Sequence, residues 1–570
     1  MQSGKALVKI FEKAGIDYIF SSPGSEWPPV WEALADLNAQ GAEKPRYINC
    51  RHEALAVTMA AGYTKVTSQP QAVLLHATAG PLNAAMALRS AYHERVPMVV
   101  CCGEVAAYGE DKRLPDPGGQ WLHDLTDLGG PADMLRRCVK WSDRISSAAI
   151  LASAAERAVQ IAQEPPAGPV LLGIPFEVMM EEAQIAEQTR ANTVARAADL
   201  NQESIQKALS HLMSAKRPVI VTEHSGEDPK AVDWLVQLSE LLAIPVMESY
   251  RPAFLNFPRT HPLYLSYDPK YIQTSDLVVI VGAITPWYPA HLEPKAATLI
   301  MIAEEFPNAR LPFWGYNVDL ALIARPGPTL QTLVKGIMAS KEFSANRPLH
   351  MERFSRIQKQ HELEEKALRN QAEEHSKDVP IDPRWLCHVV NESIPSDAIL
   401  VEETTVHRTL IQNIVRRREP MSYFGRVTGG LGVGLGCALG VKLARKSQPV
   451  FALLGDGAFH YNPVAACLGL CQEYGLPIIV ILFNNGRYLS MERSLLRYFP
   501  EGAAKKTGIH FGAPIHPSPD YQLLARAYGG YGVRVEHPND IRTAIDQALK
   551  HSAQGRLSLL DIVLNDYTPR

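Results

Sequence analysis

The chain alternates short apolar runs with longer amphipathic segments along its whole length. Residues 3–14 carry apolar side chains at helical spacing, and a compact apolar run follows at residues 18–20. Further runs of strand length occur at 72–76, 98–102, 170–174, 219–222, 277–281, 298–302, 399–402, 450–454, 478–483 and 557–563. Apolar strands that alternate with helices are typical of parallel sheets built from βαβ units. We therefore predict an α/β protein.

Two polar stretches interrupt this alternation. Residues 183–201 are rich in Ala, Thr and Gln, and residues 349–377 are dense in Glu, Lys, Arg, Gln and His. We interpret the first as a linker and the second as a solvated connecting helix or linker. The pattern predicts three doubly wound parallel-sheet domains, at residues 1–185, 200–342 and 380–570.

Composition narrows the function classes. The 570 residues carry a net charge of -3 and are 46% hydrophobic, with no basic excess that would hold a nucleic-acid backbone. None of the eight cysteines forms a CxxC pair, so we interpret them as buried small side chains in a reducing, cytoplasmic protein. Lysines and a glutamate interrupt the first helix, unlike a signal peptide, and no run reaches the roughly 20 apolar residues of a membrane span. We expect a soluble protein without nucleic-acid or membrane partners.

The sharpest chemical signal lies in the third predicted domain. The apolar run ending at Leu454 leads into Gly455-Asp456-Gly457, and the next run ends in a double asparagine whose second member is Asn485. Parallel strands place both turns at the carboxyl edge of the sheet, where open α/β sheets bind ligands. Glycines let the backbone approach a phosphate, and oxygens of Asp456 and Asn485 suit Mg²⁺. The carbonyl of Arg487 is a candidate third ligand.

This pair of motifs resembles the diphosphate-binding signature of thiamine diphosphate (ThDP) enzymes. The resemblance implies that ThDP binds through Mg²⁺ and contacts Ala458 and Tyr488. In segment 428–432 (Thr-Gly-Gly-Leu-Gly) it implies contacts from Gly430 and from Leu431, which matches an apolar wedge beneath the cofactor. It also implies diphosphate contacts from residues after the first strand of this domain, namely Thr404, Thr405 and His407.

A second family pattern lies in the first domain. Segment 47–54 (Tyr-Ile-Asn-Cys-Arg-His-Glu-Ala) leads into a predicted helix of small residues near 53–67 and resembles the family's strand and activating glutamate. The resemblance implies that Glu53 hydrogen-bonds the aminopyrimidine ring of ThDP and promotes loss of the reactive proton. Without the resemblance, a glutamate in a first helical turn is also an ordinary dipole-compensating residue.

The candidate substrate pocket is similar to that of benzoylformate decarboxylases. Ser25 matches a serine that binds the substrate carboxylate, and His76 matches a histidine that transfers protons. Pocket-wall positions fall on Ser490 and Ser494, with Met491 between them. A small serine in place of an aromatic residue implies room for a bulky substrate or a second aldehyde.

The chain also departs from these relatives. Their second histidine, in the central domain, corresponds to Pro289, and His291 lies two residues later, so Trp287 or Tyr288 is an alternative pocket residue. A longer Gly/Pro-rich loop carries Gln120, which we compare with a functional glutamine of acetolactate synthases. The pyruvate decarboxylase glutamate corresponds to Met491, with Glu492 one residue further.

The expected function is a ThDP- and Mg²⁺-dependent C–C bond lyase or ligase acting on 2-oxo acids, with possible carboligation to an aldehyde or ketone. One alternative is an acetolactate synthase-like carboligase with FAD in the central domain, although Glu223 and His224 replace the glycines usual after its first strand. Another is a non-catalytic ThDP-binding scaffold. In the family the site forms between subunits, which implies a homodimer at minimum and a homotetramer as the expected assembly.

Overall fold

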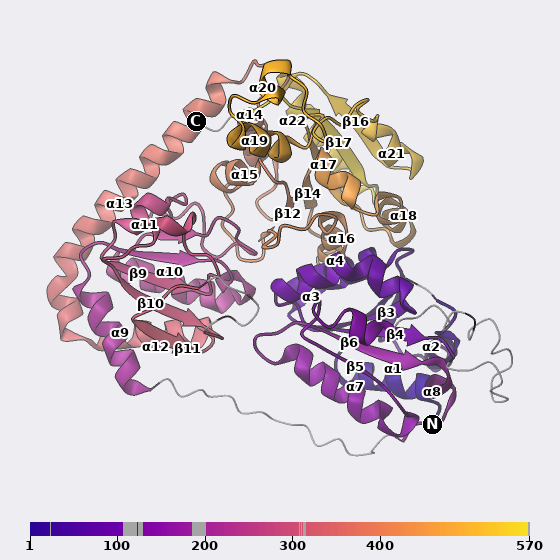
Figure 1. Ribbon diagram of the computed structural model, residues 1–570. Helices are drawn as coiled ribbons and strands as arrows, with labels where there is room; N and C mark the ends of the chain where they lie inside the picture. The colour runs from indigo at the N-terminus through magenta and orange to yellow at the C-terminus, as the bar shows by residue number, and fades with distance from the viewer. Residues whose placement is uncertain are drawn as a thin grey trace.

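The computed structural model describes residues 1–22, 24–106, 122, 129–184, 201–306, 308, 311 and 315–567. These residues form three parallel sheets, each flanked by helices (Figure 1). The predicted α/β class is therefore confirmed. In Figure 1 the N-terminal unit is indigo to purple, the central unit magenta and the C-terminal unit orange to yellow.

The first sheet has the strand order β2-β1-β3-β4-β6-β5. Its strands are β1 (Tyr18–Ser21), β2 (Arg46–Asn49), β3 (Gln71–His76), β4 (Met98–Glu104), β5 (Trp141–Arg144) and β6 (Pro169–Pro175). The helices are α1 (Ser3–Lys13), α2 (Pro28–Ala39), α3 (Glu53–Thr67), α4 (Ala79–His93), α6 (Gly130–Met134), α7 (Ala148–Gln163) and α8 (Phe176–Met180). Interior strands such as β4 and β6 are buried at every position, which explains their uniform apolar character.

The central sheet has the order β11-β10-β9-β7-β8. Its strands are β7 (Pro218–Thr222), β8 (Val246–Glu248), β9 (Leu277–Val281), β10 (Thr298–Ala303) and β11 (Leu320–Ile323). Its helices are α9 (Gln202–Ser214), α10 (Pro229–Leu242), α11 (Pro269–Gln273) and α12 (Pro326–Ala339). Asn201 and Asp228 start α9 and α10 because their side chains accept hydrogen bonds from the first helical turn.

The third sheet has the order β13-β12-β14-β15-β17-β16, which repeats the order of the first sheet. Its strands are β12 (Ile399–Glu403), β13 (Tyr423–Phe424), β14 (Val450–Gly455), β15 (Ile479–Asn484), β16 (Tyr531–Val535) and β17 (Ser558–Val563). Its helices are α14 (Pro383–Ser393), α15 (Arg408–Ile414), α16 (Gly434–Ala444), α17 (Asp456–Tyr461), α18 (Val464–Tyr474), α19 (Leu489–Tyr498), α20 (Ala503–Thr507), α21 (Tyr521–Ala527) and α22 (Ile541–Ala553). The repeated order indicates that the outer two units share one topology.

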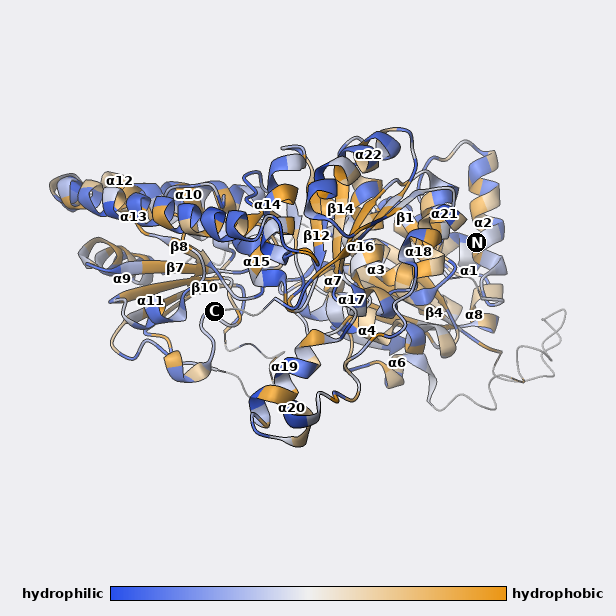
Figure 2. Ribbon diagram, turned by 90° about the horizontal axis from the view of Figure 1, so that it is seen from above, coloured by the Kyte–Doolittle hydropathy of each residue, from blue (hydrophilic) through white to orange (hydrophobic). Residues whose placement is uncertain are grey.

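The charged segment between the second and third units forms one long helix, α13 (Lys341–Glu374). It runs along the outside of the molecule in Figure 1, and Figure 2 shows it mostly blue while the strands are orange. Ile357 and His361 are among its few buried residues, so α13 touches the body of the protein along one narrow face. No helix among the described residues is long and apolar enough to cross a membrane.

Helices α3 and α16 join the first and third units directly. A Cβ added to Gly436 would lie 1.9 Å from Thr58 Oγ1, and one added to Gly440 would lie 2.0 Å from the Met59 carbonyl oxygen. Only glycine permits so close a backbone approach. Helix α3, which begins at Glu53, is therefore locked against helix α16, which follows the Gly430–Leu431 turn.

Candidate active site

The third sheet provides a crevice at its carboxyl edge. Its strand order reverses between β12 and β14, and ligands of open α/β sheets bind outside the carboxyl ends of the strands at such a switch point. Thr404 and Thr405 follow β12, while Gly455 ends β14 and pairs with Phe483 of β15. The predicted diphosphate-binding residues therefore gather at one edge of one sheet.

Asp456 has the chemistry expected of a cation ligand. Its Oδ1 accepts a hydrogen bond of 2.9 Å from the Gly457 N–H, while its buried Oδ2 has no hydrogen-bond partner among the described residues. Burial raises the pKa of Asp456 to about 6, although nearby backbone N–H groups favour its charged form. A buried carboxylate oxygen without a partner is costly, and a bound cation would remove that cost.

The two residues of the double asparagine differ in burial and in their hydrogen-bond partners. Asn484 is buried, and its amide donates a 2.7 Å hydrogen bond to Asp561 Oδ1, which fixes the end of β15. Asn485 is only partly buried, and its Oδ1 accepts a hydrogen bond of 3.2 Å from the Arg487 N–H. Gly486, between Asn485 and Arg487, has φ +66°, which turns the chain back at this point. Asn485 is thus the member available to a ligand.

The space around this turn suits Mg²⁺ and a diphosphate. A Cβ added to Gly455 would meet nothing within 4 Å, while one added to Gly457 would lie 2.7 Å from the ring of Tyr488. The backbone at Gly455 is therefore open to a ligand, and Tyr488 covers Gly457 from the side. Ala458 continues α17 and is buried. With the oxygens of Asp456, Asn485 and Arg487, these residues fit a diphosphate held through a cation.

Glu403 is a site residue that the sequence analysis did not identify. Its fully buried carboxylate accepts hydrogen bonds from the backbone N–H groups of Gly432, Val433 and Gly434 at 2.8, 3.0 and 3.0 Å. The side chain of Asn462 donates a fourth, at 2.8 Å. This arrangement caps α16 and fixes the Gly430–Leu431 turn. Its only sequence signal is a glutamate at the end of an apolar strand.

The structure separates the three predicted contacts after β12. Thr404 is buried, and both its hydroxyl and its backbone N–H donate to Glu402. His407 is buried against Phe483 at a ring separation of 5.3 Å, and burial lowers its pKa to about 3, so the ring is neutral. Thr405 is exposed. Thr405 is therefore the only one of the three with an exposed side chain.

Glu53 begins α3, as expected. His52 caps the helix, its Nδ1 accepting a hydrogen bond of 3.1 Å from the Ala54 N–H. Asn83 of α4 donates to Glu53 Oε2 at 3.3 Å. One turn further along α4, Met86 lies against the turn before α16, since a Cβ added to Gly430 would be 1.6 Å from Met86 Cε. Helix α4 therefore borders both Glu53 and the turn that carries Leu431.

Ser25 and His76 follow or end neighbouring strands, β1 and β3, at the switch point of the first sheet. His76 ends β3, and Ser25 lies in the turn after β1 with its side chain exposed. Glu26, the next residue after Ser25, is completely buried and places Oε2 2.8 Å from His76 Nδ1. The structure thus places the two predicted substrate residues at the same edge of the first sheet and adds a buried carboxylate in contact with His76.

Helix α19 carries the predicted pocket wall. Ser490 and Ser494 are one turn apart on the same face, and Met491 is 52% exposed beside them. Glu492 pairs with Arg487 at 3.2 Å and with His510 at 3.0 Å. Glu492 is therefore engaged in holding α19 to the Asn485–Arg487 turn and to the segment after α20.

The central-domain candidates differ in exposure. Trp287, considered for the pocket wall, is 1% exposed and packs in the core of the central unit against Tyr316 at 4.8 Å between ring centroids. Its neighbour Tyr288 is 58% exposed and stacks on Tyr250 at 6.1 Å. His291 is exposed in a short 3-10 helix. Burial of the large Trp287 indole in the core removes more apolar surface from water than a position in a pocket wall would. Gln120 lies outside the described residues.

The corresponding edge of the central sheet carries two buried ionisable side chains, Glu223 and His224. Glu223 follows β7, is 2% exposed and accepts a hydrogen bond of 3.2 Å from the Ile284 N–H beyond β9. His224 beside it is also buried, and burial lowers its pKa. A carboxylate thus sits where a dinucleotide diphosphate would approach the backbone, so these residues do not fit FAD bound in that manner.

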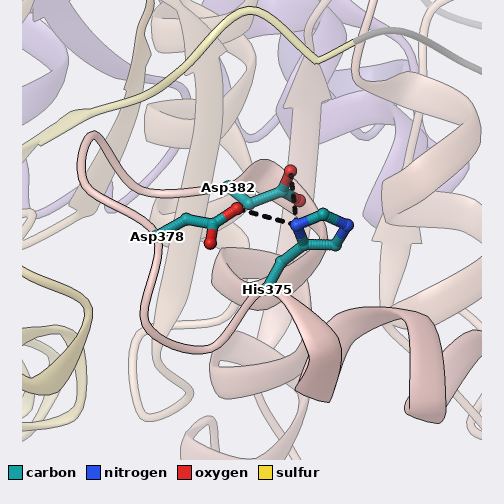
Figure 3. A group of neighbouring side chains, drawn as sticks. All are labelled: His375, Asp378 and Asp382. Carbon is teal, nitrogen blue, oxygen red and sulfur yellow. Dashed lines mark hydrogen bonds and ion pairs between the residues drawn. The ribbon is translucent and has the colours of Figure 1, made fainter.

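Another group of possible metal ligands lies between α13 and α14 (Figure 3), comprising His375, Asp378 and Asp382. Four of its nitrogen and oxygen atoms already have partners. His375 Nδ1 lies 2.7 Å from Asp378 Oδ2. Asp382 caps α14 and accepts two hydrogen bonds from the Arg384 guanidinium, at 2.8 and 2.7 Å. We therefore interpret the group as a helix junction.

Comparison with known families agrees with the motifs. Three models of thiamine pyrophosphate (thiamine diphosphate) enzymes match: the N-terminal TPP binding domain at residues 1–127, the central domain at 205–333 and the C-terminal TPP binding domain at 403–562. The third match covers Asp456 and Asn485, and the first covers Glu53.

Individual proteins match over almost the whole chain. Benzoylformate decarboxylase of Pseudomonas aeruginosa is 28% identical and covers 99% of each chain. The acetolactate synthase large subunit of Haemophilus influenzae is 24% identical, over 99% of this chain and 95% of its own. The solved thiamine diphosphate-dependent 4-hydroxybenzoylformate decarboxylase of Rhodococcus jostii RHA1 is 25% identical, covers 100% of both chains and superposes with a TM-score of 0.78. With the fold, the strand-edge site and all three domain models in agreement, the chain belongs to the thiamine pyrophosphate enzyme family.

Proposed function

We propose that this protein is a ThDP- and Mg²⁺-dependent enzyme that cleaves the bond between the carboxylate and the carbonyl carbon of a 2-oxo acid, like the benzoylformate decarboxylases it resembles. The observation that carries the proposal is Asp456, with its buried, unpartnered Oδ2 beside the Asn485 turn. Bound ThDP supplies an electron sink for the electrons left when carbon dioxide departs. The protein residues hold the cofactor, orient the substrate and move protons.

Each group of residues takes one of these tasks. Asp456, Asn485 and the carbonyl of Arg487 hold Mg²⁺, with Gly430, Leu431, Gly455 and Thr405 around the cofactor. Glu53 hydrogen-bonds the aminopyrimidine ring, and its partly exposed position at the start of α3 supports this role. Ser25 binds the substrate carboxylate, and His76 exchanges protons with the reacting group.

The side chains of the predicted pocket wall limit the size of the substrate. Ser490 and Ser494 form a small polar face of α19, so the wall leaves room for a bulky 2-oxo acid or for a second aldehyde or ketone. Carboligation to such an acceptor is the second activity we propose for the site. The acetolactate synthases among the relatives are the comparison that supports it.

The direct test supplies purified protein with ThDP and Mg²⁺ and offers a panel of aliphatic and aromatic 2-oxo acids, with and without aldehydes. We expect carbon dioxide release from aromatic or branched substrates and mixed products when an aldehyde is present. Glu53→Gln removes the ionisable carboxylate without a change of shape and should lower kcat by about 100-fold or more, while ThDP still binds. Turnover of pyruvate alone would contradict the pocket argument. Equal activity of the variant would contradict the role of Glu53.

An FAD-binding carboligase is the alternative within the family. Glu223 and His224 fill the central strand edge, which argues against this function. The visible absorption spectrum of the purified protein distinguishes the two, because bound flavin is yellow. A colourless, active enzyme supports the decarboxylase, and stoichiometric flavin supports the carboligase. A ThDP-binding scaffold without activity would bind the cofactor but turn over none of the substrates.

We further propose a homodimer as the smallest active unit, assembled into a homotetramer. Partly exposed apolar side chains surround the candidate site: Leu82, next to Asn83, is 52% exposed, and Tyr461, beside Gly432, is 55% exposed. A second chain would cover them. Sedimentation of the purified protein at several concentrations measures the assembly.

A further inference from the structure

Glu26 and His76 form a pair at the edge of the first sheet. Glu26 lies in the turn after β1 and is 0% exposed, while His76 ends β3 with its side chain 33% exposed. The carboxylate Oε2 lies 2.8 Å from the imidazole Nδ1. The other oxygen, Oε1, is buried and has no hydrogen-bond partner among the described residues. Glu26 is therefore a buried carboxylate held beside a partly exposed imidazole.

Two glycines make room for the pair. A Cβ added to Gly24 would lie 2.4 Å from both Glu26 Oε2 and His76 Nδ1, and one added to Gly103 would lie 2.5 Å from Glu26 Cβ. Neither position could carry a side chain without moving Glu26 or His76. The same turn places Ser25 outward and Glu26 inward, so one short segment supplies both a candidate substrate ligand and a partner for His76.

We propose that Glu26 is a positioning residue for His76. Its carboxylate accepts a hydrogen bond from Nδ1–H, so proton exchange with the substrate occurs at Nε2. Its negative charge also favours the protonated imidazolium, because opposite charges in contact attract and the carboxylate is shielded from water. This inference rests on the proposed function for the role of His76 in turnover, but the pairing itself is a property of the protein without cofactor or substrate.

Other ionisable groups near the pair do not replace Glu26. Glu104, on the neighbouring strand β4, accepts a hydrogen bond of 2.5 Å from Arg144 Nε. Burial raises the pKa of the Cys102 thiol well above its usual value, so it stays neutral. Glu53 lies across the start of α4, with its Cγ 3.4 Å from the position of a Cβ on Gly80. Glu26 is the carboxylate that contacts the ring of His76 directly.

The first test needs no activity. Exchange of the imidazole C2 hydrogen with deuterium, followed by mass spectrometry on the peptide that contains His76, gives the pH midpoint of this ring in the cofactor-free protein. Glu26→Gln keeps a carbonyl oxygen for Nδ1–H but removes the charge, so the midpoint should fall by about one pH unit or more. Glu32→Gln, at an exposed position on α2, is the matched control and should leave the midpoint unchanged. An unchanged midpoint in Glu26→Gln overturns the proposal.

The second test separates positioning from general stability. If Glu26 acts through His76, Glu26→Gln should lower kcat by about 10-fold with little change in KM, and should cost almost nothing further in a His76→Gln background. An equal loss in both backgrounds would mean a purely structural role and would overturn the proposal. If Glu26→Gln does not fold, Glu26→Asp is the substitute. The shorter side chain keeps the negative charge but moves it away from His76, so we expect a smaller fall of the midpoint. If the wild-type protein decarboxylates no 2-oxo acid, the proposed function fails, and the exchange midpoint still decides on the pair.

Discussion

At the scale of single residues, Asp456 affects both the stability of the protein without a ligand and the proposed binding of a cation. Its buried Oδ2 has no hydrogen-bond partner among the described residues, and burial raises the pKa of Asp456 to about 6. The ionised carboxylate is therefore unfavourable in the protein without a ligand. A bound divalent cation would reverse that balance, so the feature that destabilises the protein without a ligand would favour the proposed cation binding.

Replacement of this carboxylate should separate stability from function. We expect Asp456→Asn to abolish Mg²⁺-dependent ThDP binding and to raise the melting temperature of the cofactor-free protein by a few degrees, because a neutral amide replaces a buried charge. Calorimetric titration and thermal denaturation measure the two effects. Asp546→Asn, at an exposed position on α22, is the control. Loss of stability without loss of cofactor binding would contradict the assignment.

At the scale of elements, Glu403 connects a strand to the start of a helix. It ends β12, and its carboxylate accepts the first free N–H groups of α16, including those of Gly432 and Gly434. A helix N-terminus favours a negative charge, and each unsatisfied buried N–H is costly. The turn that carries Leu431 is therefore held by β12 rather than by its own sequence.

Glu403→Gln should loosen this turn. The glutamine amide group would face backbone N–H donors, so we expect a loss of about 1–3 kcal/mol in local stability and a weaker affinity for ThDP. Cofactor titration by intrinsic fluorescence and hydrogen exchange at α16 report these changes. Glu373→Gln on the exposed face of α13 should change neither. Unaltered exchange at α16 in Glu403→Gln would refute the role of this carboxylate.

The start of α14 should respond to acid. Burial opposes ionisation of Asp382, but hydrogen bonds and charge from Arg384 outweigh it and hold the pKa of Asp382 below its ordinary value of 3.8. A carboxylate with a lowered pKa stabilises the fold above its ordinary pKa, and this stabilisation is lost as the pH falls through the lower folded-state value.

Asp382→Asn keeps a capping side chain but removes the charge. The variant should melt at a lower temperature than the wild type at pH 7, and the gap should close below about pH 4, as the carboxylate is protonated. Differential scanning calorimetry across this range measures the gap. A gap that stays constant with pH would show that charge is not the cause.

At the scale of the whole molecule, the first and third units meet through α3 and α16. Gly436 and Gly440 bring α16 against Thr58 and Met59, and Met86 of α4 touches the turn before α16. The element that begins at Glu53 and the element that follows Leu431 are thus parts of one packed body. Motion at this contact would therefore move the start of α3, with Glu53, relative to the turn before α16.

The proposed dimer can be tested by mixing two inactive proteins. If each site takes Glu53 from one chain and Asp456 from another, Glu53→Gln and Asp456→Asn subunits combine to give one intact site in each mixed dimer. Random mixing should then restore roughly a quarter of wild-type activity, because half of the dimers are mixed and half of their sites are intact. Activity that remains absent after subunit exchange would place the whole site within one chain.

The interior strands could be predicted from the sequence because they are apolar on both faces. The apolar run at residues 277–281 forms β9, and the predicted helix at 53–67 is α3. Several edge strands gave no such signal. β5 and β16 pair on one side only and are partly exposed, so their sequences need not be apolar.

The residues of the candidate site also differ in this respect: some could be identified from the sequence and others only from the tertiary structure. The sequence alone determined the α/β class and the Gly-Asp-Gly and double-asparagine turns, because strand burial and close approach to a phosphate restrict the residue types near the site. Only the tertiary structure decided that Glu403 holds the Leu431 turn, that Trp287 belongs to a core and that Glu26 stands behind His76. Glu403 lies 29 residues before Gly432 in the sequence, and Glu26 lies 50 residues before His76, so these contacts form only when the sheets fold. Burial and pairing of a side chain depend on which strands become neighbours, and local sequence carries no record of that.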